Sequence, residues 1–329
     1  MTYFPFAQYW WFYLSFISFV LVVLSIDLGV FNKKAHTPSF KEASLWTVVW
    51  FSLAMIFCAV FYYYCVHKFT LDPVTGFAPQ ELAQLLSLQF LTGYMVELFL
   101  SVDNIFIFIV IFNYFAIQEK YQHRILFYGI LGALIFRGIF IALGSALMSI
   151  KFVVLFFGAL LVYTGAKMMW PSNHEKELKP EQNFFIKFLK KLMPVYPKID
   201  NDRFFVKIKH QWHMTPLFIA LVFLELTDIV FAIDSVPAIF AVTKESMVVF
   251  TSNIFAILGL RSLYFMLIGV IGKFKYLKYG LGFVLVFVGN KMLWLNDAYG
   301  GHFPAGYSLL IITGAIGLSI LATFFVKKR

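Results

Sequence analysis

Long apolar stretches, separated by short polar ones, run along almost the whole chain. A transmembrane helix needs about 20 consecutive, mostly apolar residues, and nine of the stretches are of suitable length. They lie approximately at 9–31, 44–66, 88–113, 125–148, 152–170, 215–242, 248–272, 278–295 and 304–326. The pattern predicts an all-α polytopic membrane protein with about nine transmembrane helices.

The charges of the connecting loops predict how these helices are oriented. If the N-terminus is outside, the inner loops and the C-terminal tail carry most of the Lys and Arg residues, and the outer loops carry only Lys68, Lys151 and Lys244. Cytoplasmic loops of membrane proteins are enriched in Lys and Arg. We therefore expect an outer N-terminus, a cytoplasmic C-terminus and an odd number of spans.

The composition excludes several other classes of protein. Hydrophobic residues make up 61% of the chain and charged residues only 13%, whereas a soluble domain is about one quarter charged. The net charge of +10 follows from the basic loops, so we expect the lipid bilayer as a partner and no nucleic acid. We do not expect an enzyme, because the sequence has no nucleophile–base constellation, phosphate-binding loop or redox motif.

Two parts of the chain resemble each other. Arg137, Gly158, Gly165, Lys167 and Trp170 recur at one constant spacing as Arg261, Gly282, Gly289, Lys291 and Trp294. Each part holds three predicted spans with no span between them, and because three is odd, the two parts must have opposite orientations. Inverted repeats of this kind are common in transporters, which bind their substrate near the membrane midplane where the repeats meet.

The repeat divides the chain into five segments. Two N-terminal transmembrane helices occupy 1–87, and the first three-helix repeat occupies 88–170. A polar cytoplasmic linker follows at 171–214, and the second, inverted repeat covers 215–295. The last transmembrane helix and a basic tail occupy 296–329.

Acidic residues inside the predicted spans mark the candidate site. Glu97 and Asp103 lie six residues apart in the first repeat, and Asp228 and Asp234 have the same spacing in the second, close to Glu225. Ionisable side chains within a bilayer are costly and by default mark a functional site. Neutral oxygen donors on the helix faces of these acids are Ser101, Asn104 and Ser235.

Two residues predict distorted helices beside the carboxylates. Pro237 has no N–H to donate to the carbonyl of Ile233, which leaves this oxygen free next to Asp234. Gly93 lies one turn before Glu97 and can loosen the first helix in a similar way. Freed carbonyls beside carboxylates coordinate cations in the broken helices of transporters.

The basic residues within the spans are fewer than the acidic ones. Arg137 and Arg261 lie deep in their spans and are expected to pair with two of the Asp side chains. Lys167 and Lys291 lie near span ends, where their side chains can extend to water. Asp27, near the inner end of the first span, is either a solvated helix-end residue or a gate ligand. A surplus of carboxylates remains that must bind cations or take up protons.

The ligand types indicate which ion these carboxylates suit. Oxygen ligands without His or Cys favour hard ions such as Mg²⁺, Ca²⁺ or Mn²⁺ over Zn²⁺. Metal binding releases protons from the same carboxylates, which makes protons a natural exchange partner. We therefore expect a divalent cation and protons as substrates and no permanently bound cofactor. The sequence leaves open whether the chain forms a homo-oligomer or has a membrane partner.

Three motifs resemble the TerC family of integral membrane proteins, in particular its Alx-like bacterial branch. They lie at Glu97–Asn104, Thr227–Ala238 and Gly259–Tyr264, and the resemblance covers almost the whole chain. It implies a bacterial inner-membrane protein linked to manganese export and to resistance against metal or alkaline stress. It also implies kinship with the LysE-type exporter superfamily, which has inverted three-helix repeats. The family's acidic site residues correspond here to Glu97, Asp103, Asp228 and Asp234.

The resulting hypothesis is an exporter of divalent cations, above all Mn²⁺, coupled to protons. The expected metal ligands are Asp103 and Asp234 at the centre, with Glu97, Asp228 and Glu225 completing the shell or carrying protons. Arg137 and Arg261 are expected to hold these carboxylates in place. Two alternatives stay open: an exporter of a small organic cation, and a non-transporting scaffold for a metal- or tellurite-stress complex that acts through the 171–214 linker.

Overall fold

The structure is a computed structural model that describes residues 3–26, 38–147, 150–170, 193–196, 203–208, 210–268, 276–299 and 303–325. Within these residues, eight helices are long and apolar enough to cross a membrane. They are α1 (Phe6–Ile26), α2 (Phe40–Leu71), α3 (Pro79–Tyr114), α4 (Glu119–Leu147), α5 (Lys151–Met169), α7 (Pro216–Phe240), α8 (Ser246–Leu267) and α11 (Ala305–Phe325). Helices suit a bilayer because they satisfy every backbone N–H and C=O internally. The predicted all-α polytopic membrane fold is confirmed.

The predicted span at 278–295 is a helix whose geometry changes along its length. α9 (Leu277–Asn290) passes into a π-helical turn, η4 (Lys291–Leu295), which is followed by the short α10 (Asn296–Ala298). Single π-helical turns are rare and often lie at functional sites.

Lys291, the first residue of this π-helical turn, is buried. Its side chain is 2% exposed, and its Nζ donates a hydrogen bond to Oγ of Ser308 in α11 at 3.0 Å. The ring of Phe303 also lies close, with its centroid 5.7 Å from the same Nζ. The prediction that Lys291 extends to water is therefore wrong, because α11 packs along α9 and covers it.

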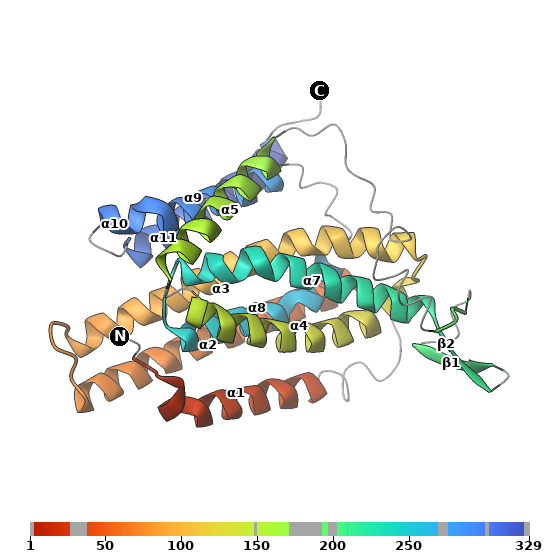
Figure 1. The fold of residues 1–329 in the computed structure, drawn as a ribbon, viewed down its shortest axis with the longest axis horizontal. Coiled ribbons are helices and arrows are strands. Elements are labelled where there is room, and N and C mark those ends of the chain that lie inside the picture. The colour runs from red at the N-terminus through yellow and green to blue at the C-terminus, as the bar shows by residue number, and fades with distance from the viewer. Residues whose placement is uncertain are drawn as a thin grey trace.

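Four helices, α3, α4, α7 and α8, form the centre of the molecule. α3 packs along α8 and α4 along α7, in the middle of Figure 1. α8 is the most enclosed helix, with 94% of its most apolar 18 residues buried. α2 packs against α3 and α8, and α1 lies at the lower edge of the bundle in Figure 1. The two helices that carry the acidic motifs, α3 and α7, thus belong to the centre of the molecule.

α5, α9 and α11 lie together at the top of Figure 1. α5 and α9 cross at pairs of glycines: a Cβ on Gly165 would lie 2.5 Å from the carbonyl oxygen of Gly282, and one on Gly289 would lie 2.7 Å from that of Gly158. Only glycine permits so close an approach of two backbones. The two contacts are reciprocal. Gly165 meets Gly282, the repeat counterpart of Gly158, and Gly158 meets Gly289, the repeat counterpart of Gly165. An inverted repeat would have this reciprocity, and the repeat itself stays a prediction.

α2 and α3 are longer than the spans predicted for them. Their 32 and 36 residues extend about 48 Å and about 54 Å, against a hydrocarbon core about 30 Å thick. Most of the additional turns, 67–71 and 79–87, lie where the two helices are joined, on the predicted outer side. The N-terminus and α10 lie at the same end, on the left of Figure 1.

A small β-hairpin precedes α7, within the predicted linker 171–214. β1 (Phe205–Ile208) and β2 (Gln211–Met214) are antiparallel. The sequence did not predict them, because strands of four residues are too short for a clear alternation of polar and apolar positions. Of this linker, 171–192, 197–202 and Lys209 lie outside the described residues.

α3 and α7 are continuous despite the residues predicted to distort them. α7 remains helical for three residues beyond Pro237, although this residue still cannot donate to the carbonyl of Ile233. Gly93 allows close packing instead of loosening α3: a Cβ there would lie 2.9 Å from Oγ of Ser252 and 3.2 Å from Cγ2 of Ile239. Side chains of α7 and α8 therefore pack against the backbone of α3 one turn from Glu97.

Candidate functional site

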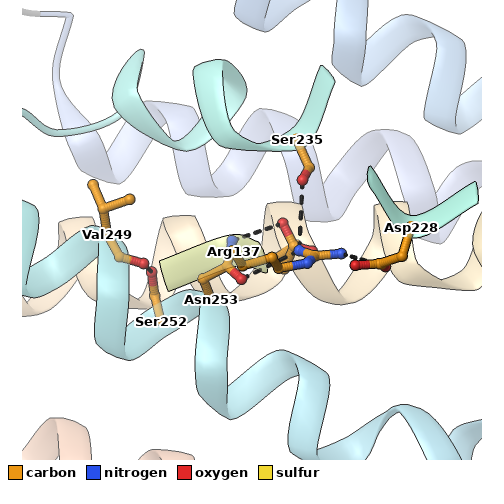
Figure 2. Close-up of polar contacts among 7 residues, drawn as sticks. Arg137, Asp228, Ser235, Val249, Ser252 and Asn253 are labelled. Carbon is orange, nitrogen blue, oxygen red and sulfur yellow. Dashed lines mark hydrogen bonds and ion pairs between the residues drawn. The ribbon is translucent and has the colours of Figure 1, made fainter. Parts of the chain in front are cut away.

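A cluster of buried polar side chains lies between the four central helices. It consists of Glu97 from α3, Arg137 from α4, Asp228 and Ser235 from α7, and Asn253 from α8. Each of these side chains is at most 3% exposed. Figure 2 shows Asp228, Ser235 and Asn253 around the guanidinium of Arg137. Acidic residues from both predicted repeats thus meet at one arginine.

Arg137 contacts two carboxylates at once. Its Nη1 forms an ion pair with Oε1 of Glu97, and its Nη2 donates to Oδ1 of Asp228 at 3.3 Å. Nη1 also donates to Oδ1 of Asn253 at 3.2 Å and to Oγ of Ser235 at 3.5 Å, as the dashed lines of Figure 2 indicate. A planar guanidinium with five N–H groups can make such divergent contacts, whereas a Lys ammonium is a single point charge. Arg137 therefore links α4 to α3, α7 and α8.

Asn253 completes this cluster and was not among the residues predicted from sequence. Its Oδ1 accepts from Arg137, and its Nδ2 donates to Oε2 of Glu97 at 3.3 Å. The Asn253 amide thus bridges the Glu97 carboxylate and the Arg137 guanidinium. The available signal was the run Thr251–Ser252–Asn253, three polar residues in an otherwise apolar span.

The spacing of residues along α3 and α7 positions these side chains. Seven residues, about two helical turns, separate Asp228 from Ser235, so both face Arg137. Ser101 follows Glu97 by about one turn and is fully buried, and Asn104 is 3% exposed. The face of α3 that carries side-chain oxygens therefore continues from Glu97 toward the C-terminal end of the helix.

Glu225 lies on α7 about one turn before Asp228, outside the contacts of Arg137. Its carboxylate packs directly against the backbone of Gly132 in α4, where a Cβ would overlap it. Among the described residues, no hydrogen-bond partner reaches the buried Oε2 of Glu225, Oδ2 of Asp228 or Oγ of Ser101. Buried polar atoms in proteins nearly always have a partner, so these oxygens are candidates for contact with a bound cation or a proton.

Three of the predicted site residues are not placed by the structure. Asp103 and Asp234 belong to α3 and α7, but their side chains are not among those described, and Asp27 lies outside the described residues. Within the described set, no three His, Cys, Asp or Glu side chains are grouped as a metal site requires. The described part of the site is therefore a pair of carboxylates on one arginine, with Glu225 beside it.

Arg261, the predicted counterpart of Arg137, lies on α8 two turns beyond Asn253. It lines a small cavity together with Asp228 and Leu224. It also lines a second small cavity, next to His123 and Glu42. Arg261 thus lies between two cavities. One contains the central Asp228, and the other lies toward the end of the bundle far from the α2–α3 connection.

The charges of the cluster are unequal. Glu97 and Asp228 share the single positive charge of Arg137, so one negative charge remains when both acids are ionised. A buried charge is tolerated only when it is paired and hydrogen-bonded. A buried surplus carboxylate can be neutralised by a proton or by a cation, and carboxylate, hydroxyl and amide oxygens suit hard divalent ions. The arrangement is therefore chemically suited to exchange a proton for a cation.

Known proteins match most of the chain. The profile of the "Integral membrane protein TerC family" matches residues 83–329. A relative from Myxococcus xanthus, named "Uncharacterized membrane protein STKORF319", is 45% identical over 316 residues, which are 96% of this chain and 92% of the relative. One from Escherichia coli K12, named "Putative membrane-bound redox modulator Alx", is 40% identical over 317 residues, 96% of this chain and 94% of the relative. No solved structure matches the chain.

Proposed function

Because the chain belongs to the TerC family of integral membrane proteins, we propose that it is a transporter that exports a divalent cation in exchange for protons. Mn²⁺ is the cation that we propose, with Ca²⁺ and Mg²⁺ as the competing hard ions. The direction rests on an orientation in the bacterial inner membrane with the N-terminus outside and the C-terminus in the cytoplasm, for which the basic residues of the inner loops are the support.

The surplus of buried carboxylate oxygen around Arg137 carries this proposal. Two acids share one guanidinium, and buried oxygens of Asp228, Glu225 and Ser101 lack a hydrogen-bond partner among the described residues. A purely structural ion pair would be expected to satisfy each oxygen, because an unpaired buried polar atom costs about 1–3 kcal/mol. A site that alternately holds a cation and protons uses such oxygens in its working cycle.

Each acidic residue has a proposed role in this cycle. Asp103 and Asp234 are the proposed central ligands, and Glu97, Asp228 and Glu225 complete the shell or carry protons. Arg137 occupies one oxygen of Glu97 and one of Asp228. It thereby keeps the affinity for the cation moderate, which release on the far side requires.

The name of the Escherichia coli relative suggests a redox role, for which this chain offers little support. Its two cysteines, Cys58 and Cys65, are seven residues apart on α2, and both are buried and free. About 10 Å of helix separates their positions, which is beyond the reach of a disulfide. An organic-cation exporter and a scaffold acting through the 171–214 linker are tested by the experiment below.

The test is Mn²⁺ flux into vesicles reconstituted with the pure protein, with and without an imposed pH gradient. We expect saturable flux that dissipates the gradient and that Asp234→Asn lowers about tenfold or more, because an amide is a poorer ligand than a carboxylate for a hard cation. The matched control is Asp72→Asn, a substitution of the same type at an exposed residue after α2.

The outcomes separate the alternatives. Equal flux in the parent and in Asp234→Asn would exclude the carboxylate site. Absence of flux for Mn²⁺, Ca²⁺ and Mg²⁺ from folded protein would favour an organic cation as cargo or the scaffold. The scaffold reading further predicts that deletion within the 171–214 linker abolishes metal resistance in cells, whereas Asp234→Asn does not.

A further inference from the structure

A cavity of about 440 Å³ opens at the predicted outer end of the molecule. It lies between the outer turns of α3, the connection from α7 to α8, the starts of α10 and α11, and the N-terminal segment. The polar residues in its wall are Gln89, Thr243, Lys244, Glu245 and Asn296. A smaller cavity of about 130 Å³ shares Gln89, Thr243, Lys244 and Asn296 and adds Asp297. We call these two adjacent cavities together the outer vestibule.

The outer vestibule lies in line with the buried carboxylates along α3. Gln89, Gly93 and Glu97 follow one another at intervals of four residues, about one turn each, on the same side of the helix. The rise from Gln89 to Glu97 is therefore about 12 Å. α7 leads to the same place, because it ends at Phe240 and the following residues, 241–245, line the vestibule. α3 thus passes along the vestibule, and α7 ends at it.

α3 packs tightly against α7 and α8 between the vestibule and Glu97. Gly93 lies midway, where even a Cβ would come within 2.9 Å of Oγ of Ser252 and 3.2 Å of Ile239. Ser252 and Ile239 are both fully buried. The structure is thus closed at this level, with the vestibule on one side and the Arg137 cluster on the other.

The vestibule wall presents oxygen atoms and nearly balanced charge. Thr243 donates to Oε1 of Gln89 at 2.6 Å, which fixes both oxygens at the wall. The carboxylate of Glu245 accepts from the backbone N–H groups of Tyr3 at 2.7 Å and Phe4 at 3.3 Å. Its charge and that of Asp297 are partly offset by the adjacent Lys244. Oxygen donors with little net charge bind a hydrated cation weakly, as a site of release requires.

We propose that the outer vestibule is a second, low-affinity site for a divalent cation, which it receives from the buried carboxylates and releases to the outside still partly hydrated. This assignment rests on the proposed transport function. The contact at Gly93 is the gate between the two sites, and it opens when α3 and α8 separate there. Gln89, Thr243 and Glu245 supply the oxygens of the outer site, which contact the ion through its water shell.

The test measures Mn²⁺ binding in the vestibule without relying on transport. A nitroxide is attached to a Leu85→Cys thiol, because Leu85 lines the vestibule one turn outward from Gln89. Cys58 and Cys65 are buried, so the label goes to the introduced thiol. The matched control is Leu71→Cys, at the outer end of α2, where the side chain is 74% exposed and does not line the vestibule.

Bound Mn²⁺ broadens the signal of a nearby nitroxide. We expect saturable signal loss from the Leu85→Cys label and only a linear, collisional loss from the Leu71→Cys label. Adding Glu245→Gln to the Leu85→Cys protein should raise the Mn²⁺ concentration for half-maximal loss about fivefold, because one ionic oxygen is lost. Linear loss at both positions, in protein that transports Mn²⁺, would overturn the outer site and leave the proposed function standing. Saturable loss without any Mn²⁺ flux would overturn the transport function and with it the exit role.

Discussion

Within the described part of the chain, Arg137 makes polar contacts from α4 to α3, α7 and α8. Replacing it by Gln would remove the guanidinium that pairs with the buried carboxylates of Glu97 and Asp228. Removing one partner of a buried ion pair costs about 3–5 kcal/mol. We therefore expect Arg137→Gln to lower the melting temperature of the detergent-solubilised protein markedly, as measured by intrinsic fluorescence.

A second substitution checks the cause of this loss. Adding Glu97→Gln to Arg137→Gln removes one of the two stranded charges, so part of the lost stability should return. If Arg137→Gln melts like the parent, the ion pairs do not stabilise the fold. If the double variant is no more stable than Arg137→Gln, the loss is not electrostatic.

Gly132 provides a way to move Glu225 without changing its chemistry. A methyl group at this position would overlap the Glu225 carboxylate, so Gly132→Ala must displace it. Displacing a group that supports a metal site typically costs about 10–100-fold in affinity or activity, and we expect a loss of Mn²⁺ flux in this range. The control is Gly138→Ala in the same helix, where nothing lies within 4 Å of the added methyl group. Equal flux in the two variants would remove Glu225 from the proposed site.

At this scale the sequence predicted which acids lie at the centre of the bundle better than it predicted their partners. Acids in apolar spans singled out Glu97, Asp228 and Glu225, and Glu97 and Asp228 do meet at Arg137. Their partners depend on how four helices are rotated against one another, and a sequence pattern does not specify this rotation. For that reason Arg137 was expected to pair with Asp residues alone, and Asn253 was missed.

At the scale of helices, the contact between α5 and α9 depends on the absence of side chains. Gly165→Ala would place a Cβ 2.5 Å from the backbone carbonyl of Gly282, and a backbone cannot yield as a flexible side chain can. Overpacking of this kind costs about 1–3 kcal/mol. We expect a lower melting temperature for Gly165→Ala than for Gly314→Ala, an alanine introduced into open space on α11. Equal melting temperatures would mean that α5 and α9 separate at little cost.

The helices themselves were largely predictable, and their ends were not. Long apolar runs follow from the thickness of the bilayer, so nine spans could be read from hydrophobicity alone. The thickness of the bilayer does not determine the outer turns of α2 and α3 or the β-hairpin. Tertiary contacts determine the environment of the π-helical turn at Lys291. Lys291 illustrates the second case, since its burial depends on α11.

At the scale of the whole molecule, Glu245 joins the N-terminal segment to the start of α8. Its carboxylate holds the backbone of Tyr3 and Phe4, which precede it by more than 240 residues, and no sequence pattern predicts a contact of this range. Burial raises the pKa of Glu245 above its usual value of 4.5, although the two N–H groups and nearby Lys68 oppose the rise. The folded protein therefore holds this proton more tightly than the unfolded chain does.

The sign of the pH dependence follows from this difference in proton binding. A carboxyl group with a raised pKa stabilises the fold fully below its unfolded pKa, and this contribution is lost as pH rises through the folded pKa. In Glu245→Gln the side chain is neutral at every pH and keeps an oxygen for the N–H groups of Tyr3 and Phe4. We expect the parent and the variant to melt alike in acid, and the parent to fall below the variant as the pH rises from about 4 to about 8. The measurement is the melting temperature of both proteins over this range. A parent that gains stability relative to the variant would show that the two hydrogen bonds outweigh the burial of the charge, and that the N-terminal segment is held to α8 chiefly by an ionised Glu245.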